Sequence, residues 1–91
     1  MAINELYQTI LSRKNTPAEE SYTASLFAKG LPRIAQKVGE EGTEVVVAAL
    51  SQADERLIEE IADLTYHVLV LMAARGIAPQ DVARELEKRK K

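Results

Sequence analysis

Residues 32–76 read PRIAQKVGEEGTEVVVAALSQADERLIEEIADLTYHVLVLMAARG, and this stretch decides the fold. A proline suits the first turn of a helix, and apolar side chains recur at helical spacing from Pro32 to about Leu50. Ser51–Asp54 is a polar connection whose last residue can cap a second helix. Helical periodicity then continues over Glu55–Arg75 until Gly76 ends it. The stretch therefore predicts two long helices joined by a short connection, which is an antiparallel helical hairpin.

Shorter helices are expected on both sides of the hairpin. The first should run from Asn4, a good N-cap, to about Lys14, and the last should open at Pro79. Thr16–Glu19 can form a short helical turn, and Ser21–Thr23 is either a helix cap or a polar loop. No strand-like alternation occurs. We therefore predict one all-α domain over residues 1–91, a long antiparallel hairpin with short flanking helices.

The second hairpin helix is apolar on more than one face in its C-terminal half, where the run Val68–Met72 lies. A helix that is apolar nearly all round must be buried nearly all round. A chain of 91 residues buries a small share of its own surface. We expect a second copy to supply the missing cover, which gives a homodimer packed as a helical bundle. The alternative is that the short terminal helices cover this helix.

Composition limits the partners and the chemistry. Fourteen acidic and twelve basic residues give a net charge of −2, which predicts no general attraction to nucleic acid or anionic lipid. The chain has no cysteine, so thiolate metal sites and cysteine nucleophiles are excluded. The longest apolar stretch, Val68–Ala74, is far below the roughly 20 residues of a membrane span, and residues 1–11 do not resemble a signal peptide. We expect a cytoplasmic protein without a membrane or nucleic-acid partner.

Four carboxylates carry the most informative pattern. Glu41 and Glu44 are three residues apart, as are Glu60 and Asp63, so each pair lies on one helix face. If the hairpin folds back at Gln52, Glu44 lies level with Glu60 and Glu41 lies level with Asp63. The four carboxylates are then expected to meet across the groove between the two helices. One turn further along, Lys37 and His67 become level in the same way and place basic groups beside the acids.

A bound divalent cation would relieve the repulsion within such a cluster. Magnesium prefers hard oxygen ligands and leaves positions for water and phosphate, so we predict Mg²⁺ as the cofactor. The alternative is that these are ordinary solvated glutamates of a non-catalytic helical scaffold. Gly39 and Gly42 flank the acids although glycine costs about 1 kcal/mol relative to alanine inside a helix. They are expected to allow close approach of a phosphate, of another backbone, or of a tightly packed helix.

The motifs Glu-Glu-x-x-Glu at 40–44 and Glu-x-x-Asp at 60–63 resemble the signature of the MazG-like, all-helical NTP pyrophosphatases. Three longer strings are similar to the phosphoribosyl-ATP pyrophosphohydrolase branch of that group, and they spread over nearly the whole chain. These strings are Ser21-Tyr22-Thr23, Lys37-Val38-Gly39-Glu40-Glu41-Gly42-Thr43-Glu44 and Ala62-Asp63-Leu64-Thr65-Tyr66-His67. Gly42 is a mild departure, because the branch often has alanine at that position.

The resemblance implies an enzyme that hydrolyses phosphoribosyl-ATP to phosphoribosyl-AMP and pyrophosphate, the second step of histidine biosynthesis. It also implies magnesium and a dimer. The metal ligands implied are Glu41, Glu44, Glu60 and Asp63. Glu40 would be a further ligand or a base that orients water, and Glu41 is an alternative base. Lys37 would contact phosphate, and residues 21–23 would lie in the substrate loop.

Several of these assignments have plain alternatives. His67 can contact a phosphate or a ligand carboxylate, or it can be a hydrogen-bonded structural residue. Ser21 and Thr23 can be helix caps. The rival activity within the same class is a housekeeping pyrophosphatase that acts on deoxynucleoside or non-standard triphosphates. Phosphoribosyl-ATP tested against a panel of triphosphates separates the two activities.

Overall fold

The computed structural model describes residues 2–90; Met1 and Lys91 lie outside the described residues. The described chain forms five α-helices and two short 3-10 turns: α1 (Ile3–Ser12), η1 (Arg13–Asn15), η2 (Ala18–Glu20), α2 (Tyr22–Lys29), α3 (Leu31–Ser51), α4 (Asp54–Arg75) and α5 (Pro79–Lys88). Residues 2–90 contain no strand, and the all-α prediction is confirmed.

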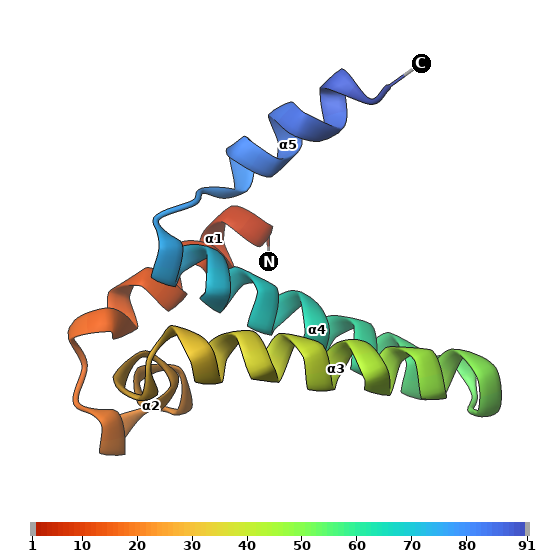
Figure 1. Ribbon diagram of the computed structural model, residues 1–91, viewed down its shortest axis with the longest axis horizontal. Helices are drawn as coiled ribbons and strands as arrows, with labels where there is room; N and C mark the ends of the chain where they lie inside the picture. Colours follow the sequence, from red (N-terminus) through yellow and green to blue (C-terminus); the bar gives the residue numbers. More distant parts are fainter. Residues whose placement is uncertain (1, 91) are drawn as a thin grey trace.

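The predicted hairpin is also confirmed, because α3 and α4 lie side by side and run in opposite directions (Figure 1). Gly30 precedes α3 with φ 93°, a conformation that residues with a Cβ rarely adopt. At the far end of α4, Gly76 takes the left-handed conformation with φ 71° and ends the helix as predicted. A glycine therefore stands at the start of α3 and another at the end of α4, next to the shorter helices.

Two predicted N-caps are wrong by one or two residues. Asn4 lies inside α1, whose N-cap is Ala2, and Asp54 is the first residue of α4, whose N-cap is Ala53. In α1 the Ala2 N–H donates to the Glu5 carboxylate at 3.2 Å, so an acid inside the first turn satisfies the cap backbone. The hairpin connection is consequently shorter than predicted.

The segment between α1 and α2 resolves an open alternative. Thr16–Glu19 was expected to form a helical turn, and the 3-10 turn η2 occupies Ala18–Glu20. Ser21 follows as the N-cap of α2, with its hydroxyl oxygen accepting from the Ala24 N–H at 3.1 Å. The predicted helical turn therefore occurs at η2, and Ser21 is a helix cap rather than part of a polar loop. The first helix is shorter than predicted, since α1 ends at Ser12 and η1 continues to Asn15.

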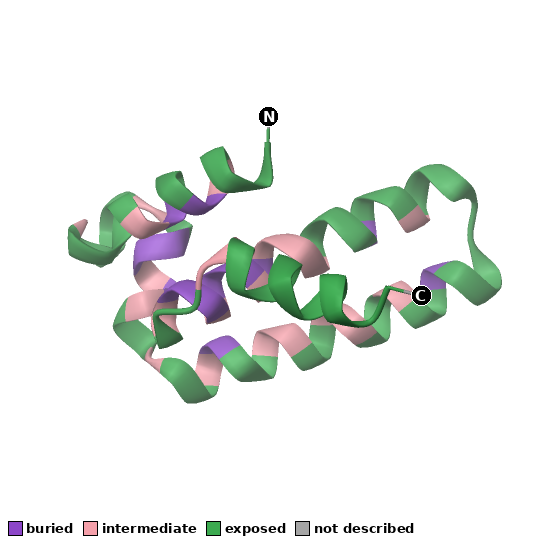
Figure 2. Ribbon diagram, turned by 90° about the horizontal axis from the view of Figure 1, so that it is seen from above, coloured by how far each residue is buried: buried purple, intermediate pink, exposed green. Residues whose placement is uncertain are grey.

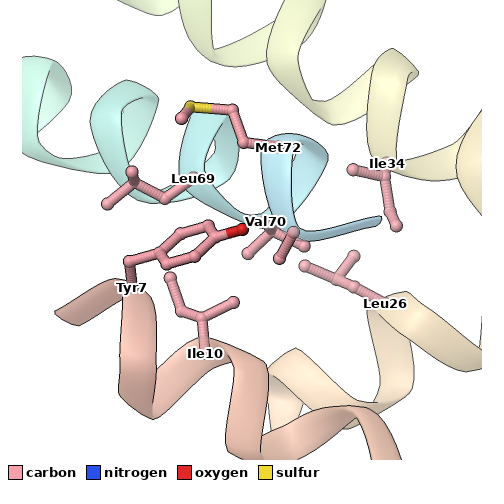
Figure 3. Packing of buried hydrophobic residues seen from close by; sticks show 8 residues of the cluster. Tyr7, Ile10, Leu26, Ile34, Leu69, Val70 and Met72 are labelled. Carbon is pink, nitrogen blue, oxygen red and sulfur yellow. The ribbon is translucent and has the colours of Figure 1, made fainter. Parts of the chain in front are cut away.

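The buried core lies at one end of the hairpin, where α1 and α2 pack against α3 and the C-terminal half of α4 (Figures 2 and 3). The residues that form it are Tyr7, Ile10, Leu26, Ile34, Leu69, Val70, Met72 and Ala73. This corrects the expectation that a second copy is needed to cover the C-terminal half of α4. The short N-terminal helices of the same chain bury much of that apolar run.

The opposite half of the hairpin has no such cover within residues 2–90, and it is drawn almost entirely as exposed in Figure 2. Large apolar side chains lie exposed there: Val46, Val47, Leu50, Ile58 and Ile61. Helix α5 points away from the hairpin (Figure 1). Among the described residues, no single helix has the length and hydropathy needed to cross a membrane. Helices α4 and α5 have that length and hydropathy only when they are counted together, and a bend of 105° separates them.

Candidate active site

Four carboxylates from α3 and α4 lie within electrostatic reach of one another. Glu60 is buried, with 4% of its surface exposed. Burial raises the pKa of Glu60 above its usual value, Arg56 opposes this increase, and the charges of Glu44, Asp63 and Glu41 add to it. Glu44, Asp63 and Glu41 therefore lie close enough to Glu60 to influence its pKa, and the meeting of all four carboxylates stays a prediction.

Each helix neutralises one of these carboxylates with its own cation. Lys37 Nζ lies 3.4 Å from Glu41 Oε1, and an Arg56 guanidinium nitrogen lies 3.3 Å from Glu60 Oε1. Both pairs have the i, i+4 spacing that brings side chains together on a helix. Within residues 2–90, no three acidic or histidine groups converge closely enough to enclose a metal ion. The two ion pairs give a physical reason for this lack of convergence, because each cation holds its carboxylate toward its own helix.

Glu40 has a different set of partners. Its carboxylate lies 3.5 Å from Arg33 and 3.7 Å from Lys37, and it accepts a hydrogen bond from the Gln36 amide at 3.0 Å. Glu41 has 13% of its side chain exposed, whereas Glu40 is largely open to solvent. Glu41 is therefore the better enclosed of the two adjacent acids.

Lys37 remains positively charged at the edge of the carboxylates. Burial is the largest single influence and lowers the pKa of Lys37, but the charges of Tyr22, once ionised, and of the Glu41 and Glu40 carboxylates outweigh burial, so the pKa is raised. The ammonium group is only partly exposed. A fixed cation beside an acidic groove is suited to bind a phosphate group.

The predicted substrate residues at the start of α2 contact α4 directly. The Tyr22 hydroxyl lies 2.9 Å from His67 Nε2, and His67 Nδ1 lies 2.8 Å from the Asp63 carbonyl oxygen. Thr23 is buried and hydrogen-bonded to the Tyr66 hydroxyl. The rings of Tyr22 and Tyr66 stack with centroids 6.5 Å apart. Tyr22, Tyr66 and His67 thus form one polar cluster with Thr23, and the alignment of Lys37 with His67 stays a prediction.

Comparison with known proteins decides the family. The model of the phosphoribosyl-ATP pyrophosphohydrolase family matches residues 3–90. The chain belongs to the phosphoribosyl-ATP pyrophosphohydrolase family. It is 52% identical over 89 residues to the phosphoribosyl-ATP pyrophosphatase of Saccharolobus solfataricus and 54% identical to that of Sulfurisphaera tokodaii, covering 98% of this chain and 95% of each relative. It is 51% identical over 88 residues to that of Clostridium botulinum, covering 97% of this chain and 80% of the relative.

Two residues at the site of this phosphoribosyl-ATP pyrophosphohydrolase family member were missed in the sequence. Arg56 stands four residues before Glu60, and this spacing alone could have identified it as the partner of that acid. Tyr66 adjoins His67, but its contact with Thr23 depends on how α2 crosses α4, which spacing along the chain does not reveal. Both residues contact predicted site residues directly.

The glycines that flank the acids do not serve close packing within the chain. A Cβ built on Gly39 or Gly42 meets no atom within 4 Å. The expectation that they permit tight packing of another helix of the same chain is therefore wrong. Approach of a substrate group to these positions stays a prediction.

Proposed function

We propose that this chain hydrolyses phosphoribosyl-ATP to phosphoribosyl-AMP and pyrophosphate, with Mg²⁺ as its cofactor. The observation that carries the proposal is the set of four neighbouring carboxylates on α3 and α4, with Lys37 at their edge, in a chain of this family. Relatives from both archaea and bacteria carry the name phosphoribosyl-ATP pyrophosphatase. The activity would be the second step of histidine biosynthesis.

The donor set fits a hard divalent cation. Glu41, Glu44, Glu60 and Asp63 offer only oxygen ligands, and the buried Glu60 carries a charge that burial and its acidic neighbours disfavour. These four residues would hold the ion once Lys37 and Arg56 release their carboxylates. When bound, Mg²⁺ supplies neutralisation of the charge that develops on the phosphate oxygens and the pyrophosphate leaving group.

A carboxylate would take the proton from the attacking water. The reaction breaks a phosphoanhydride bond by attack of water at the α or β phosphorus and needs no covalent enzyme intermediate. We propose Glu41 for this role because it is the better enclosed of the two candidates, and Glu40 as the alternative base. Glu40 can also orient the water from the Lys37 side of the groove, since it contacts the same ammonium group.

Substrate recognition would involve the layer next to the acids. Lys37 would bind a phosphate, and residues 21–23 would form the substrate loop at the start of α2. Ser21 caps this helix through its hydroxyl, which supports a role in holding the loop in place. His67 is buried behind Tyr22, which supports a role exerted through that side chain. Residues 21–23 can therefore both cap α2 and bind the substrate.

We also propose that the chain acts as a homodimer, built on the uncovered half of the hairpin. Leu50 is 83% exposed and Ile58 65% exposed, and they belong to an apolar face shared by α3 and α4. A second copy with the same face would bury these side chains in a four-helix arrangement. The interface would lie on the same half of the hairpin as Glu60, because the exposed residues Ile58 and Ile61 stand on either side of it along α4. The cytoplasm stays the predicted compartment.

The decisive experiment is an assay of pyrophosphate release from phosphoribosyl-ATP, with and without Mg²⁺. The proposal expects turnover that depends on magnesium and kcat/KM at least about a hundredfold above that for ATP, deoxynucleoside triphosphates and inosine triphosphate. Comparable turnover of the triphosphate panel would favour the housekeeping activity. Absence of both magnesium binding and pyrophosphate release would favour the non-catalytic scaffold.

Charge-neutral variants test the acidic residues within the same assay. Glu41→Gln and Asp63→Asn should each lower kcat by about a hundredfold or more while the helical circular dichroism signal stays unchanged. Glu59→Gln is the matched control, because Glu59 is an exposed acid of α4 beside Glu60 that lies outside the four-carboxylate cluster. Near-normal turnover of Glu41→Gln or Asp63→Asn would contradict the assignment.

A further inference from the structure

A chain of two hydrogen bonds joins the first residue of α2 to the backbone of α4. It runs from the Tyr22 hydroxyl to His67 Nε2 at 2.9 Å, and from His67 Nδ1 to the Asp63 carbonyl oxygen at 2.8 Å. Tyr22 is half exposed, with 53% of its surface open, whereas His67 is 5% exposed. One end of the chain therefore faces solvent, and the other end is fixed inside the protein.

The direction of the protons in this chain follows from the acceptor at its buried end. A carbonyl oxygen can only accept, so His67 Nδ1 carries the hydrogen and donates it to Asp63. A second hydrogen on Nε2 would make a buried imidazolium, yet neither ring nitrogen contacts a carboxylate. The neutral ring leaves a lone pair on Nε2, and the Tyr22 hydroxyl donates to it.

This direction limits what Tyr22 can bind. A phenol has one proton, and the Tyr22 proton is used by His67. Toward the site the oxygen can only accept, so its partner must be a hydrogen-bond donor. Deprotonated phosphate oxygens can only accept hydrogen bonds, so they are not partners for Tyr22. The neighbouring cation Lys37 is the residue suited to bind them. Tyr22 is thus matched to a sugar hydroxyl or to an N–H of a base.

We propose that His67 is a positioning residue that fixes Tyr22 as a hydrogen-bond acceptor for a donor group on the nucleoside part of the substrate, either a ribose hydroxyl or a base N–H. The inference rests on the proposed function for the identity of the substrate. His67 itself does not contact the substrate. Its role is to remove the Tyr22 proton from the binding surface and to hold the phenol oxygen at the edge of the acidic groove.

The neighbouring pair Thr23 and Tyr66 provides a matched control. These two hydroxyls are hydrogen-bonded to each other, and Thr23 follows Tyr22 on α2 while Tyr66 precedes His67 on α4. Like the Tyr22–His67 pair, they join α2 to α4, but Thr23 is buried. A general loosening of α2 should therefore follow from Tyr66→Phe as well. An effect of Tyr22 orientation should follow only from changes at Tyr22 and His67.

The kinetic test compares variants of both pairs with phosphoribosyl-ATP. Tyr22→Phe and His67→Ala should each raise KM by roughly three- to tenfold with little change in kcat, as expected when one hydrogen bond common to ground and transition states is lost. The double variant should be no worse than the single ones. His67→Gln should restore most of the affinity, since its amide oxygen can accept from Tyr22. Tyr66→Phe measures the effect of a general loosening of α2, and the rise in KM for Tyr22→Phe and His67→Ala should exceed it.

Deoxy analogues distinguish the two sources of the donor. If Tyr22 accepts from a ribose hydroxyl, Tyr22→Phe should lose its effect on KM for the 2′-deoxy or the 3′-deoxy analogue of phosphoribosyl-ATP. If its effect persists with the 2′-deoxy and 3′-deoxy analogues of each of the two riboses, the donor is an N–H of the base. Both results support an acceptor role for Tyr22. An equal loss of affinity for inorganic pyrophosphate in Tyr22→Phe would instead assign Tyr22 to phosphate and overturn the proposal.

A spectroscopic measurement tests the pair without turnover. The chain has a single histidine, so its imidazole nitrogen signals are unambiguous in a nitrogen-15 NMR spectrum. The wild-type protein should show a protonated Nδ1 and a hydrogen-bonded lone pair on Nε2, and Tyr22→Phe should shift the Nε2 signal alone. A protonated Nε2 with a bare Nδ1 would contradict the proposal, as would additive effects of the Tyr22 and His67 variants.

The affinity for phosphoribosyl-AMP, measured by calorimetry, separates failure of this proposal from failure of the proposed function. This product keeps both sugars and the base, so Tyr22→Phe and His67→Ala should weaken its binding by a similar factor even if no pyrophosphate is released. Absence of turnover together with these affinity losses would contradict the hydrolytic function alone. Normal turnover with unchanged affinities in both variants would contradict the positioning role alone.

Discussion

The cations Lys37 and Arg56 act as internal counter-ions for the acidic groove. Each contacts a proposed metal ligand on its own helix, so the carboxylates are not left unpaired when no ion is bound. A cation that enters the groove must compete with these side chains. Arg56 is itself half exposed, so solvent weakens its pairing with the buried Glu60 and an entering ion can displace it.

Removal of Arg56 should therefore strengthen metal binding. We expect Arg56→Gln to lower the Kd for Mg²⁺ by roughly two- to fivefold, because Glu60 loses a competing partner and the groove gains negative charge. Isothermal titration calorimetry measures the constant directly. Arg84→Gln on α5 makes the same charge change outside the site and should leave the affinity unchanged. Equal Kd values for the wild type and Arg56→Gln would contradict the competition.

Glu60 should make the metal-free fold sensitive to pH. Its pKa is raised in the folded chain above the usual 4.5, chiefly by burial, so the folded state holds this proton more tightly than the unfolded state does. The resulting stabilisation is present at acid pH. It is lost as the pH rises from about 4.5 through the raised pKa, because Glu60 must then be charged inside the groove.

The variant Glu60→Gln isolates this contribution. Without metal, its Tm should exceed that of the wild type at neutral pH, and the difference should shrink as the pH falls toward 4.5. Thermal unfolding followed by circular dichroism measures the difference. Added Mg²⁺ should also reduce it, since only the wild type gains a full set of ligands. Glu59→Gln, at an exposed position, should show no comparable pH dependence.

Helix interiors and the start of α5 at Pro79 were predicted correctly, whereas the N-cap residues of α1 and α4 were not. The periodic pattern identified α3, α4 and α5 together with the Gly76 stop. Asn4 and Asp54 were taken as caps because their side chains suit that position, but alanines precede both helices. In α1 and α5 an acid in the first turn accepts from the backbone of the cap residue, so the capping group lies inside the helix.

Carboxylate spacing predicted that Glu60 has acidic neighbours on α3 and α4, and the pKa of Glu60 responds to Glu44, Asp63 and Glu41. The contacts of Tyr22 with His67 and of Thr23 with Tyr66 could not be predicted in the same way. They depend on the direction in which α2 crosses α4. That direction is set by the packed core rather than by any local pattern.

The two kinds of glycine should respond oppositely to alanine. Gly42→Ala should stabilise α3 by about 0.5–1 kcal/mol, because the position is helical and a Cβ there meets no neighbouring atom. Gly76→Ala should destabilise the protein by about 1 kcal/mol, because φ at this position is 71°. Urea unfolding curves measure both changes. A destabilising Gly42→Ala would indicate that this site is packed against a partner.

The molecule as a whole divides into a packed end and a two-helix end. Helices α1 and α2 complete the core at the first end, while the second end presents apolar side chains of α3 and α4 to solvent. Another apolar surface lies in a groove between α1, α4 and α5, to which Val68, Met72 and Leu86 contribute. We place the dimer interface on the hairpin because its exposed face lies on the same half of the hairpin as Glu60.

One polar substitution on each surface tests this choice. Leu50→Asn should weaken dimerisation by at least about a hundredfold, since each of two copies would lose the burial of one leucine side chain. Leu86→Asn on α5 should leave the association constant unchanged. Analytical ultracentrifugation over a range of concentrations measures both. The reverse outcome would move the interface to the groove beside α5.

The proposed catalytic acids stand on the thinner half of the molecule, where two helices alone separate one solvent face from the other. If a second copy braces this half, dilution below the dimer Kd should leave the packed end folded while backbone amides around Glu44 and Glu60 begin to exchange with solvent deuterium. Turnover per chain would then fall at low enzyme concentration before any loss of the core around Tyr7 and Val70 becomes visible. With the proposed dimer, the location of the core would make enzyme concentration itself a control on activity.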